Sequence, residues 1–108
     1  MMLYIAGPMS RLPEFNYPAF HEAAARLREA GFQVVNPADG HDITKPLPAY
    51  DVMLAGALRK SLDCDAVAVL PGWEDSHGAR LEVHVAEALG RPVRPVDAWL
   101  ERAWQVTP

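Results

Sequence analysis

The sequence has one cysteine, no basic stretch and no long apolar run, and each of these absences excludes a class of protein. A lone thiol, Cys64, forms no internal disulfide and cannot complete a four-cysteine zinc site. None of the four histidines stands at the i, i+4 spacing of a helical metal motif. We therefore expect no bound metal and no cofactor.

Positive charge is also scarce, because the formal net charge is −4 and acidic and basic residues are interspersed. The chain then presents no polybasic face to a nucleic-acid polymer or to an anionic membrane. No apolar run approaches the roughly 18 residues of a membrane-spanning helix. The N-terminus also lacks the charged region of a signal peptide, so we expect a cytoplasmic protein.

Half of the 108 residues are hydrophobic, which is enough for one small domain with a core of its own. No internal repeat and no low-complexity tract divides the chain. We predict a single domain over residues 1–108.

Short apolar segments alternate with segments of helical periodicity along the chain. The predicted strands are residues 3–6, 32–35, 66–70 and 92–95, the last an edge strand because it carries two prolines. The predicted helices are residues 18–30, 50–62, 79–89 and 96–105. Strand, helix and strand in immediate succession form a right-handed parallel crossover, which predicts an α/β fold.

The most informative stretch, residues 71–82, lies between a predicted buried strand and a predicted helix. Open α/β sheets bind ligands beside the carboxyl ends of their strands. Glu82 falls early in that helix, one turn after Gly78, which leaves this side of the helix uncovered. Its carboxylate either reaches a ligand in the loop or only complements the helix dipole, an effect worth up to about 1 kcal/mol. The spacing alone favours the second interpretation, in which Glu82 only complements the helix dipole.

A second candidate loop, residues 7–17, follows the first strand. Gly7 lets backbone amides approach a bound anion and Ser10 adds a hydroxyl donor, although Gly-Pro is also an ordinary turn. Phe15 either stacks on a base or anchors the loop to the core, and core aromatic rings are the commoner kind.

Two further segments keep alternatives open. Residues 38–48 have no periodicity and form a loop that can cover a site, but we assign no role to His41 or Asp42 in it. The predicted C-terminal helix carries Trp99 and Trp104, which either seal the sheet or form a subunit contact.

Several short motifs together resemble the nucleoside 2-deoxyribosyltransferase-like superfamily, and most of all its short bacterial and phage branch. These motifs are residues 4–10 (YIAGPMS), 15–20 (FNYPAF), 35–37 (VNP), 63–65 (DCD), 70–73 (LPGW) and 76–79 (SHGA), with Glu82. The resemblance covers nearly the whole chain, and the combination is specific although each motif alone is not. It implies one Rossmann-like, three-layer domain with a small, mostly parallel sheet of four to five strands flanked by helices.

The resemblance also implies an enzyme that cleaves the N-glycosidic bond of a nucleoside or a nucleoside monophosphate. In these enzymes a glutamate early in the helix after the third strand attacks C1′, and Glu82 occupies its place. A carboxylate below the sugar stabilises an oxocarbenium-like transition state and can trap it covalently. The glutamate must be ionised, which the helix N-terminus favours.

Ser76, six residues before Glu82, resembles the phosphate-binding serine of the monophosphate N-glycosidases, where transferases of free nucleosides carry aspartate. A serine hydroxyl and the amides of a helix start suit a 5′-phosphate. Arg11 either pairs with that phosphate or blocks the loop. The implied substrate-binding residues are Gly7, Pro8, Met9, Ser10, Arg11, Phe15, Asn16, Trp73, Asp75, Ser76 and Gly78.

The sequence departs from the superfamily at Ala57, eight residues before Asp65, where an aspartate commonly serves the leaving base. Such proton transfer is worth about 10²–10⁴ in rate. We predict an N-glycosidase or transferase acting on a nucleoside or deoxynucleoside 5′-monophosphate. The alternatives are a non-catalytic nucleotide-binding or regulatory module and a self-associating protein with a vestigial pocket. The resemblance implies a homodimer or larger homo-oligomer in all three cases.

Overall fold

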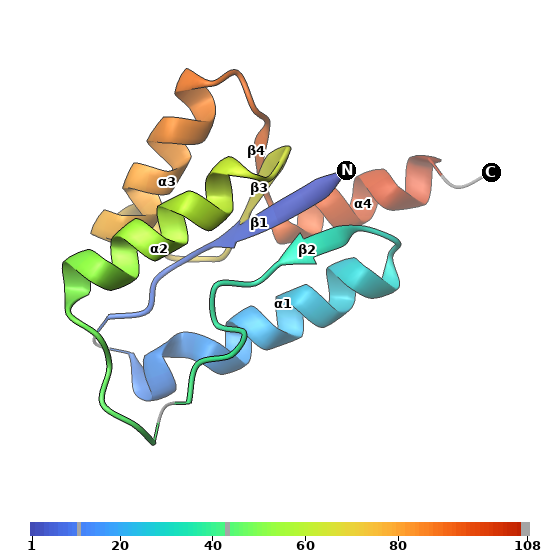
Figure 1. Cartoon of the computed structure of the whole chain (residues 1–108). Coiled ribbons are helices and arrows are strands. Elements are labelled where there is room, and N and C mark those ends of the chain that lie inside the picture. The colour runs from blue at the N-terminus through green and yellow to red at the C-terminus, as the bar shows by residue number, and fades with distance from the viewer. Residues whose placement is uncertain (11, 43, 107–108) are drawn as a thin grey trace.

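The computed structural model describes residues 1–10, 12–42 and 44–106, with side chains up to residue 101, and has a four-stranded, wholly parallel sheet flanked by helices (Figure 1). The strands are β1 (Met2–Ala6), β2 (Gln33–Val35), β3 (Ala66–Val69) and β4 (Val93–Pro95). The helices are α1 (Tyr17–Glu29), α2 (Tyr50–Leu62), α3 (His77–Ala88) and α4 (Val96–Val106), with 3-10 turns η1 (Pro13–Asn16) and η2 (Trp73–Asp75). Every predicted strand and helix is present, and the predicted α/β fold is confirmed.

The strand order β2-β1-β3-β4 makes this a small Rossmann-like sheet. The chain leaves β1 toward one edge, forms β2, and then returns to pair β3 with the other side of β1. The direction of winding therefore reverses between β1 and β3, which end side by side with Ala6 opposite Val69. A crevice for a ligand is expected outside the carboxyl ends of strands at such a point.

Helices cover both faces of the sheet, so the molecule has three layers (Figure 1). Alternate residues of a strand face opposite sides. Leu3 and Ile5 of β1 therefore enter the core beneath α1 and α4, whereas Tyr4 and Ala6 enter the core beneath α3. Because β1 is buried on both faces, it reads as a continuous apolar run rather than an alternating one.

The C-terminal helix α4 closes the sheet with Trp99, whose side chain is fully buried. Its indole Nε1–H donates to the carbonyl oxygen of Val67 in β3 at 3.0 Å. The ring meets Phe32 edge-on at 6.0 Å, and the Arg94 guanidinium lies 5.8 Å from the ring centre. Of the two alternatives for Trp99, sealing the sheet is the one observed. The side chain of Trp104 lies outside the described residues.

Helix α2 has the predicted bounds, but it is the least buried of the four helices over the described side chains. Only Ser61 of this helix is buried, while Val52 and Leu62 are 59% and 46% exposed. The reason is that α2 packs mainly against α3 and turns another side toward a pocket, described below. Within the described ranges, none of the helices is both long and apolar enough to cross a membrane.

Candidate functional site

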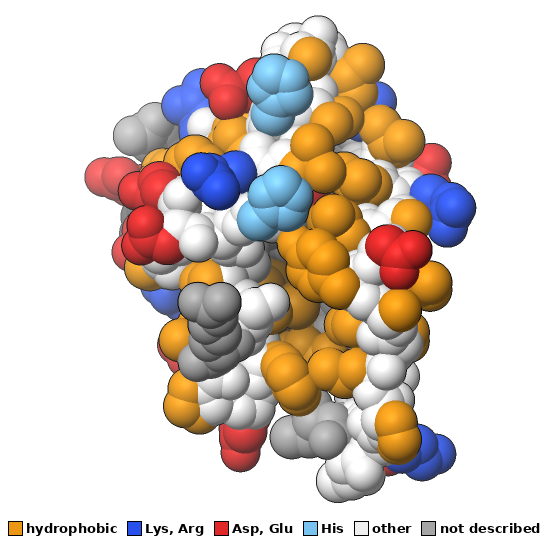
Figure 2. Space-filling view, turned by 90° about the vertical axis from the view of Figure 1, so that its left-hand side faces the viewer, with side chains coloured by type: hydrophobic (Ala, Val, Ile, Leu, Met, Phe, Trp, Pro, Cys, Tyr) orange, Lys and Arg blue, Asp and Glu red, His pale blue; other side chains and the backbone are white. Residues whose placement is uncertain are grey.

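A pocket of about 390 Å³ opens at the carboxyl edge of the sheet. Segments that follow β1, β2 and β3 all contribute to it, through Gly7, Pro37 and Ser76 respectively. Figure 2 shows the face of the molecule toward which these strand ends point, with hydrophobic side chains gathered along its middle. The volume lies within the range of small-molecule sites, roughly 300–1,000 Å³.

The acidic group in the pocket wall is Glu82, which is only 6% exposed. The phenol of Tyr4, fully buried in β1, donates a hydrogen bond to Glu82 Oε2. Oε1 makes no hydrogen bond, and no fully buried side-chain oxygen or nitrogen in the described part of the chain lacks a partner. Oε1 is therefore not fully enclosed, and Glu82 lines both this pocket and a second, much smaller cavity, while Tyr4 holds the other oxygen.

Burial raises the pKa of Glu82 from 4.5 to about 7, and the hydrogen bond from Tyr4 only partly opposes this. The pKa of Tyr4 is raised as well, first by burial and then by the charge of Glu82. The expectation that the helix N-terminus would keep Glu82 ionised is thus outweighed by desolvation. With a pKa of about 7, the carboxyl is partly protonated and partly ionised near neutral pH.

We predict that Glu82→Gln stabilises the protein at high pH. A raised pKa means that the folded state binds the proton more tightly, so the contribution of Glu82 to stability is most favourable below pH 4.5 and becomes less favourable as the pH rises toward about 7. At about 1.4 kcal/mol per pKa unit, the cost removed by the amide is about 3 kcal/mol near pH 8 and about 1 kcal/mol or less near pH 5. Urea unfolding of both proteins at the two pH values measures the difference.

The matched control is Glu87→Gln, an exposed glutamate on the same helix. We expect it to change the free energy of unfolding by no more than about 0.5 kcal/mol at either pH. A gain for Glu82→Gln that is the same at both pH values would contradict the buried, proton-binding carboxyl.

The start of α3 forms the side of the pocket next to Glu82. Ser76 is the N-cap residue, and its Oγ accepts a hydrogen bond from the Ala79 backbone N–H at 3.3 Å. This cap explains why α3 begins two residues earlier than predicted. The Ser76 hydroxyl keeps its own hydrogen for a ligand, because it only accepts in the cap. Gly78 faces Tyr50 and Leu54 of α2. A Cβ added at Gly78 would lie 3.6 Å from Tyr50 Oη and 3.4 Å from Leu54 Cδ1.

The loop after β1 forms the floor, and Gly7 is required there by packing. An added Cβ would lie 2.8 Å from both Cβ and Cδ1 of Leu70, which is itself buried after β3. The two loops at the switch point are therefore pressed together, whatever the ligand. Packing against Leu70 thus requires a glycine at position 7 independently of any anion binding.

We predict that Gly7→Ala destabilises the protein by about 1–3 kcal/mol, because a buried side chain must shift to admit the methyl group. Gly56→Ala is the contrast, since nothing lies within 4 Å of its added Cβ in α2. There the change should stabilise by up to about 1 kcal/mol through helix propensity. Thermal melts followed by far-UV circular dichroism measure both. Equal effects would show that the close approach to Leu70 is absent.

A left-handed turn connects this loop to α1. Glu14, Phe15 and Asn16 have φ angles of 53°, 53° and 60°, which cost non-glycine residues on the order of 1 kcal/mol each. In return, the Asn16 side-chain amide donates to the Pro8 carbonyl oxygen at 2.9 Å, and the Phe15 ring lines the pocket. The turn therefore ties the loop after β1 to the first helix.

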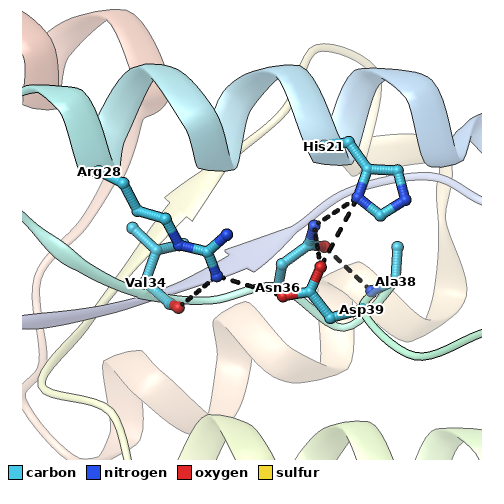
Figure 3. A network of polar contacts seen from close by, with 6 residues as sticks. All are labelled: His21, Arg28, Val34, Asn36, Ala38 and Asp39. Carbon is cyan, nitrogen blue, oxygen red and sulfur yellow. Dashed lines mark hydrogen bonds and ion pairs between the residues drawn. The ribbon is translucent and has the colours of Figure 1, made fainter.

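A polar network fixes the loop after β2 against α1 (Figure 3). Buried Asn36 accepts from the Ala38 backbone N–H at 3.0 Å and donates to Asp39 Oδ1 at 3.3 Å and to His21 Nδ1 at 3.1 Å. Arg28 donates to Asp39 Oδ2 at 3.2 Å. The network holds the start of the 38–48 loop in place, and that loop covers the pocket.

Two residues of the 38–48 loop, Leu47 and Pro48, give the pocket apolar walls, and His41 gives it an imidazole. His41 is half-buried, with its ring edge-on to Tyr17 at 6.0 Å. Its ring nitrogens make no hydrogen bond to any described residue.

Seven predicted site residues line this pocket, namely Gly7, Met9, Ser10, Phe15, Ser76, Gly78 and Glu82. Four lie outside its wall, namely Pro8, Asn16, Trp73 and Asp75. Asn16 donates a hydrogen bond to the Pro8 carbonyl oxygen. Trp73 packs against the core beneath α3, and Asp75 is exposed in η2. Arg11 lies outside the described residues.

Sequence reasoning missed Tyr4 as part of the pocket, and it considered His41 in the loop that can cover the site without assigning it a role. The alternation of faces along β1 is a signal for Tyr4, because it places Tyr4 on the same side as the helix that carries Glu82. No local signal marks His41, since the loop that carries it has no regular structure. No group of three or more His, Cys, Asp or Glu residues able to hold a metal ion occurs in the part of the chain that the structure describes.

The fold and the site define a small Rossmann-like α/β domain with one acidic, buried residue in a pocket at the carboxyl edge of its sheet. The chain belongs to the family described as Domain of unknown function (DUF4406), which it matches over residues 1–94. That range contains every residue of the pocket wall and ends within β4. No curated protein matches the sequence.

Proposed function

We propose that the protein cleaves the N-glycosidic bond of a nucleoside or deoxynucleoside 5′-monophosphate, by hydrolysis or base exchange, with Glu82 as the nucleophile. The observation that carries the proposal is the pairing of Glu82 with Tyr4 inside a pocket that also contains Gly7 and Ser76. A buried carboxylate with one oxygen held and one accessible suits attack on a sugar carbon.

In the proposed reaction, Glu82 Oε1 forms a bond to C1′ while the C1′–N bond breaks and its electron pair leaves with the base. Tyr4 holds Oε2 and so orients the carboxylate. Water, or a second base, then attacks C1′ and releases Glu82. The N-terminus of α3, with the free hydrogen of Ser76 Oγ, suits the 5′-phosphate because its backbone amides point outward.

The resemblance to the nucleoside 2-deoxyribosyltransferase-like superfamily supports this proposal. Seven of the twelve site residues that the resemblance implies, among them Gly7, Ser76 and Glu82, line one pocket although Gly7 is far from the other two in the sequence. Ala57 lines that pocket too, at the place where the superfamily has its aspartate. A missing side chain at this place also supports a second candidate, a nucleotide-binding or regulatory module without turnover.

Base release tests the proposal directly. Purified protein is incubated with each common ribonucleoside and deoxyribonucleoside, with and without its 5′-phosphate, and free base is measured by chromatography. We expect release from at least one monophosphate and little from the matching nucleoside, and an added second base separates transfer from hydrolysis. Calorimetric binding of a monophosphate without any release would favour the binding module instead.

The pH dependence of the reaction gives a further prediction. Because Glu82 must be ionised to attack and its pKa is about 7, kcat/KM should rise as the pH increases toward about 7. Tyr4→Phe removes the hydrogen bond that lowers the pKa of Glu82, so the rise should move to higher pH. A profile that is unchanged in Tyr4→Phe would contradict the role given to this pair.

With this function we propose a cytoplasmic protein, as expected from its sequence, that forms the homodimer or larger homo-oligomer that the resemblance implies. Light scattering coupled to size-exclusion chromatography measures the mass in solution. A monomeric mass at all concentrations used for the activity assay would rule out the oligomer. It would leave the proposed reaction at Glu82 unaffected.

A further inference from the structure

We infer that His41 supplies the proton to the leaving base, in place of the side chain missing at Ala57. This inference rests on the proposed function and adds a second catalytic residue to it. The need follows from chemistry, because a base that leaves without a proton carries the electron pair of the broken bond as charge. A positioned acid is worth about 10²–10⁴ in rate.

The other proton donors of the pocket wall are occupied or unsuited. Tyr4 is bonded to Glu82, and burial raises the pKa of Tyr17, which makes its phenol a weaker acid. Ser76 caps α3, and a serine hydroxyl is in any case a very weak acid. Glu82, the only carboxyl in the wall formed by the described residues, is needed as the nucleophile.

Tyr50 and Lys60 also line the pocket, from α2, but both side chains are exposed to water. An acid that acts on the base must meet it inside the site, where water is excluded. His41 is the half-buried imidazole of the wall, and histidine is the commonest general acid in enzymes.

The surroundings of His41 hold the ring and leave both nitrogens available. The backbone N–H of His41 donates to the Ala38 carbonyl oxygen at 3.3 Å, in the turn that Asn36 anchors. The ring rests edge-on against Tyr17 at 6.0 Å. Neither ring nitrogen bonds to a described residue, so either can face a base.

Glu82 Oε1 bonds to C1′, the C1′–N bond breaks, and the imidazolium of His41 gives its proton to the base, which leaves neutral. Water then bonds to C1′, the bond between C1′ and Glu82 breaks with its electron pair returning to the carboxylate, and the proton of the water passes to His41. The products are the free base and the sugar phosphate with a hydroxyl group at C1′.

Leaving-group dependence tests this role. His41→Gln and the wild type are compared on the best substrate of the nucleotide panel and on its counterpart with a better leaving base. That counterpart carries 7-methylguanine for a purine, because this base is already cationic, or 5-fluorouracil for a pyrimidine. We expect a loss of about 10²–10⁴ on the ordinary base and at least tenfold less on the activated one.

His84→Gln is the matched control, since His84 is exposed on α3 and does not line the pocket. It should leave both rates within about twofold of the wild type. His41→Ala with added imidazole is the second measurement, and we expect the imidazole to restore part of the rate on the ordinary base only. This rescue keeps the test decisive if the glutamine variant folds poorly.

Several results would overturn the inference. Equal losses of His41→Gln on both leaving groups would give His41 a structural role only, and a leaving-group-dependent loss in Lys60→Met instead would assign the proton to Lys60. In both cases the proposed function survives. Absence of base release by the wild type from every nucleotide would overturn the proposed function itself, and the inference with it.

Discussion

Glu82→Gln is expected to abolish base release, with a loss of about 10³-fold or more in kcat/KM on the best nucleotide of the panel. The amide has nearly the shape of the carboxyl and can still accept a hydrogen bond from Tyr4. It cannot attack C1′, because it carries no charge. The same variant should be more stable than the wild type near pH 8, so loss of activity cannot be ascribed to unfolding.

Single-turnover measurement of free base is the suitable assay, since it reports the chemical step even if product release is slow. Glu87→Gln is again the control and should retain activity within about twofold. Nucleotide affinity measured by calorimetry should change little in Glu82→Gln. If Glu82→Gln still releases base at a rate close to the wild type, Glu82 is not the nucleophile and the proposed mechanism fails.

Trp99→Ala is expected to have the largest effect on stability, a loss of about 3–5 kcal/mol. The side chain is fully buried, is the largest in the core, and ties α4 to β3 through the Val67 carbonyl oxygen. Its removal leaves a cavity and takes one hydrogen bond away from the Val67 carbonyl oxygen. Since small domains are stable by only about 5–15 kcal/mol, the variant should be close to unfolding at physiological temperature.

Urea unfolding followed by circular dichroism measures this loss. Trp99→Phe separates its two parts, because it keeps most of the ring volume but removes the Nε1–H donor, and we expect a loss of about 1–3 kcal/mol. Leu89→Ala, at an apolar side chain that is 52% exposed, should cost no more than about 1 kcal/mol. A similar loss for Trp99→Ala and Leu89→Ala would show that α4 does not seal the sheet.

Much of the fold could be predicted because its signals are local. The continuous apolar run before Pro71 indicates a strand buried on both faces, and β3 is buried throughout. The helical stripe between Pro18 and Gly31 matches α1 closely. Where local signals erred, a side chain in the structure explains it: Ser76 extends α3 by capping it earlier than expected.

The site could be predicted in part, and the limit is again physical. Glu82 and Ser76 could be chosen because the motifs around them resemble those of the nucleoside 2-deoxyribosyltransferase-like superfamily, whereas spacing alone favoured a helix-dipole role for Glu82. Their companions Tyr4 and His41 come from β1 and from an irregular loop, and distance in the sequence says nothing about such neighbours. The pKa of Glu82 could not be predicted for the same reason, since burial depends on what the rest of the chain places around it.

The sequence by itself determined the order of strands and helices and the α/β class, because periodicity and turn residues act over a few positions. It also placed Glu82 near the start of the helix on which the proposed function depends. Only the tertiary structure decided that Tyr4 holds one oxygen of Glu82 and that Leu70 leaves no space for a side chain at Gly7. It also decided that His41 lines the pocket. The physical reason is that the parallel sheet brings the ends of β1, β2 and β3 together at one edge, where residues from distant segments line the same pocket.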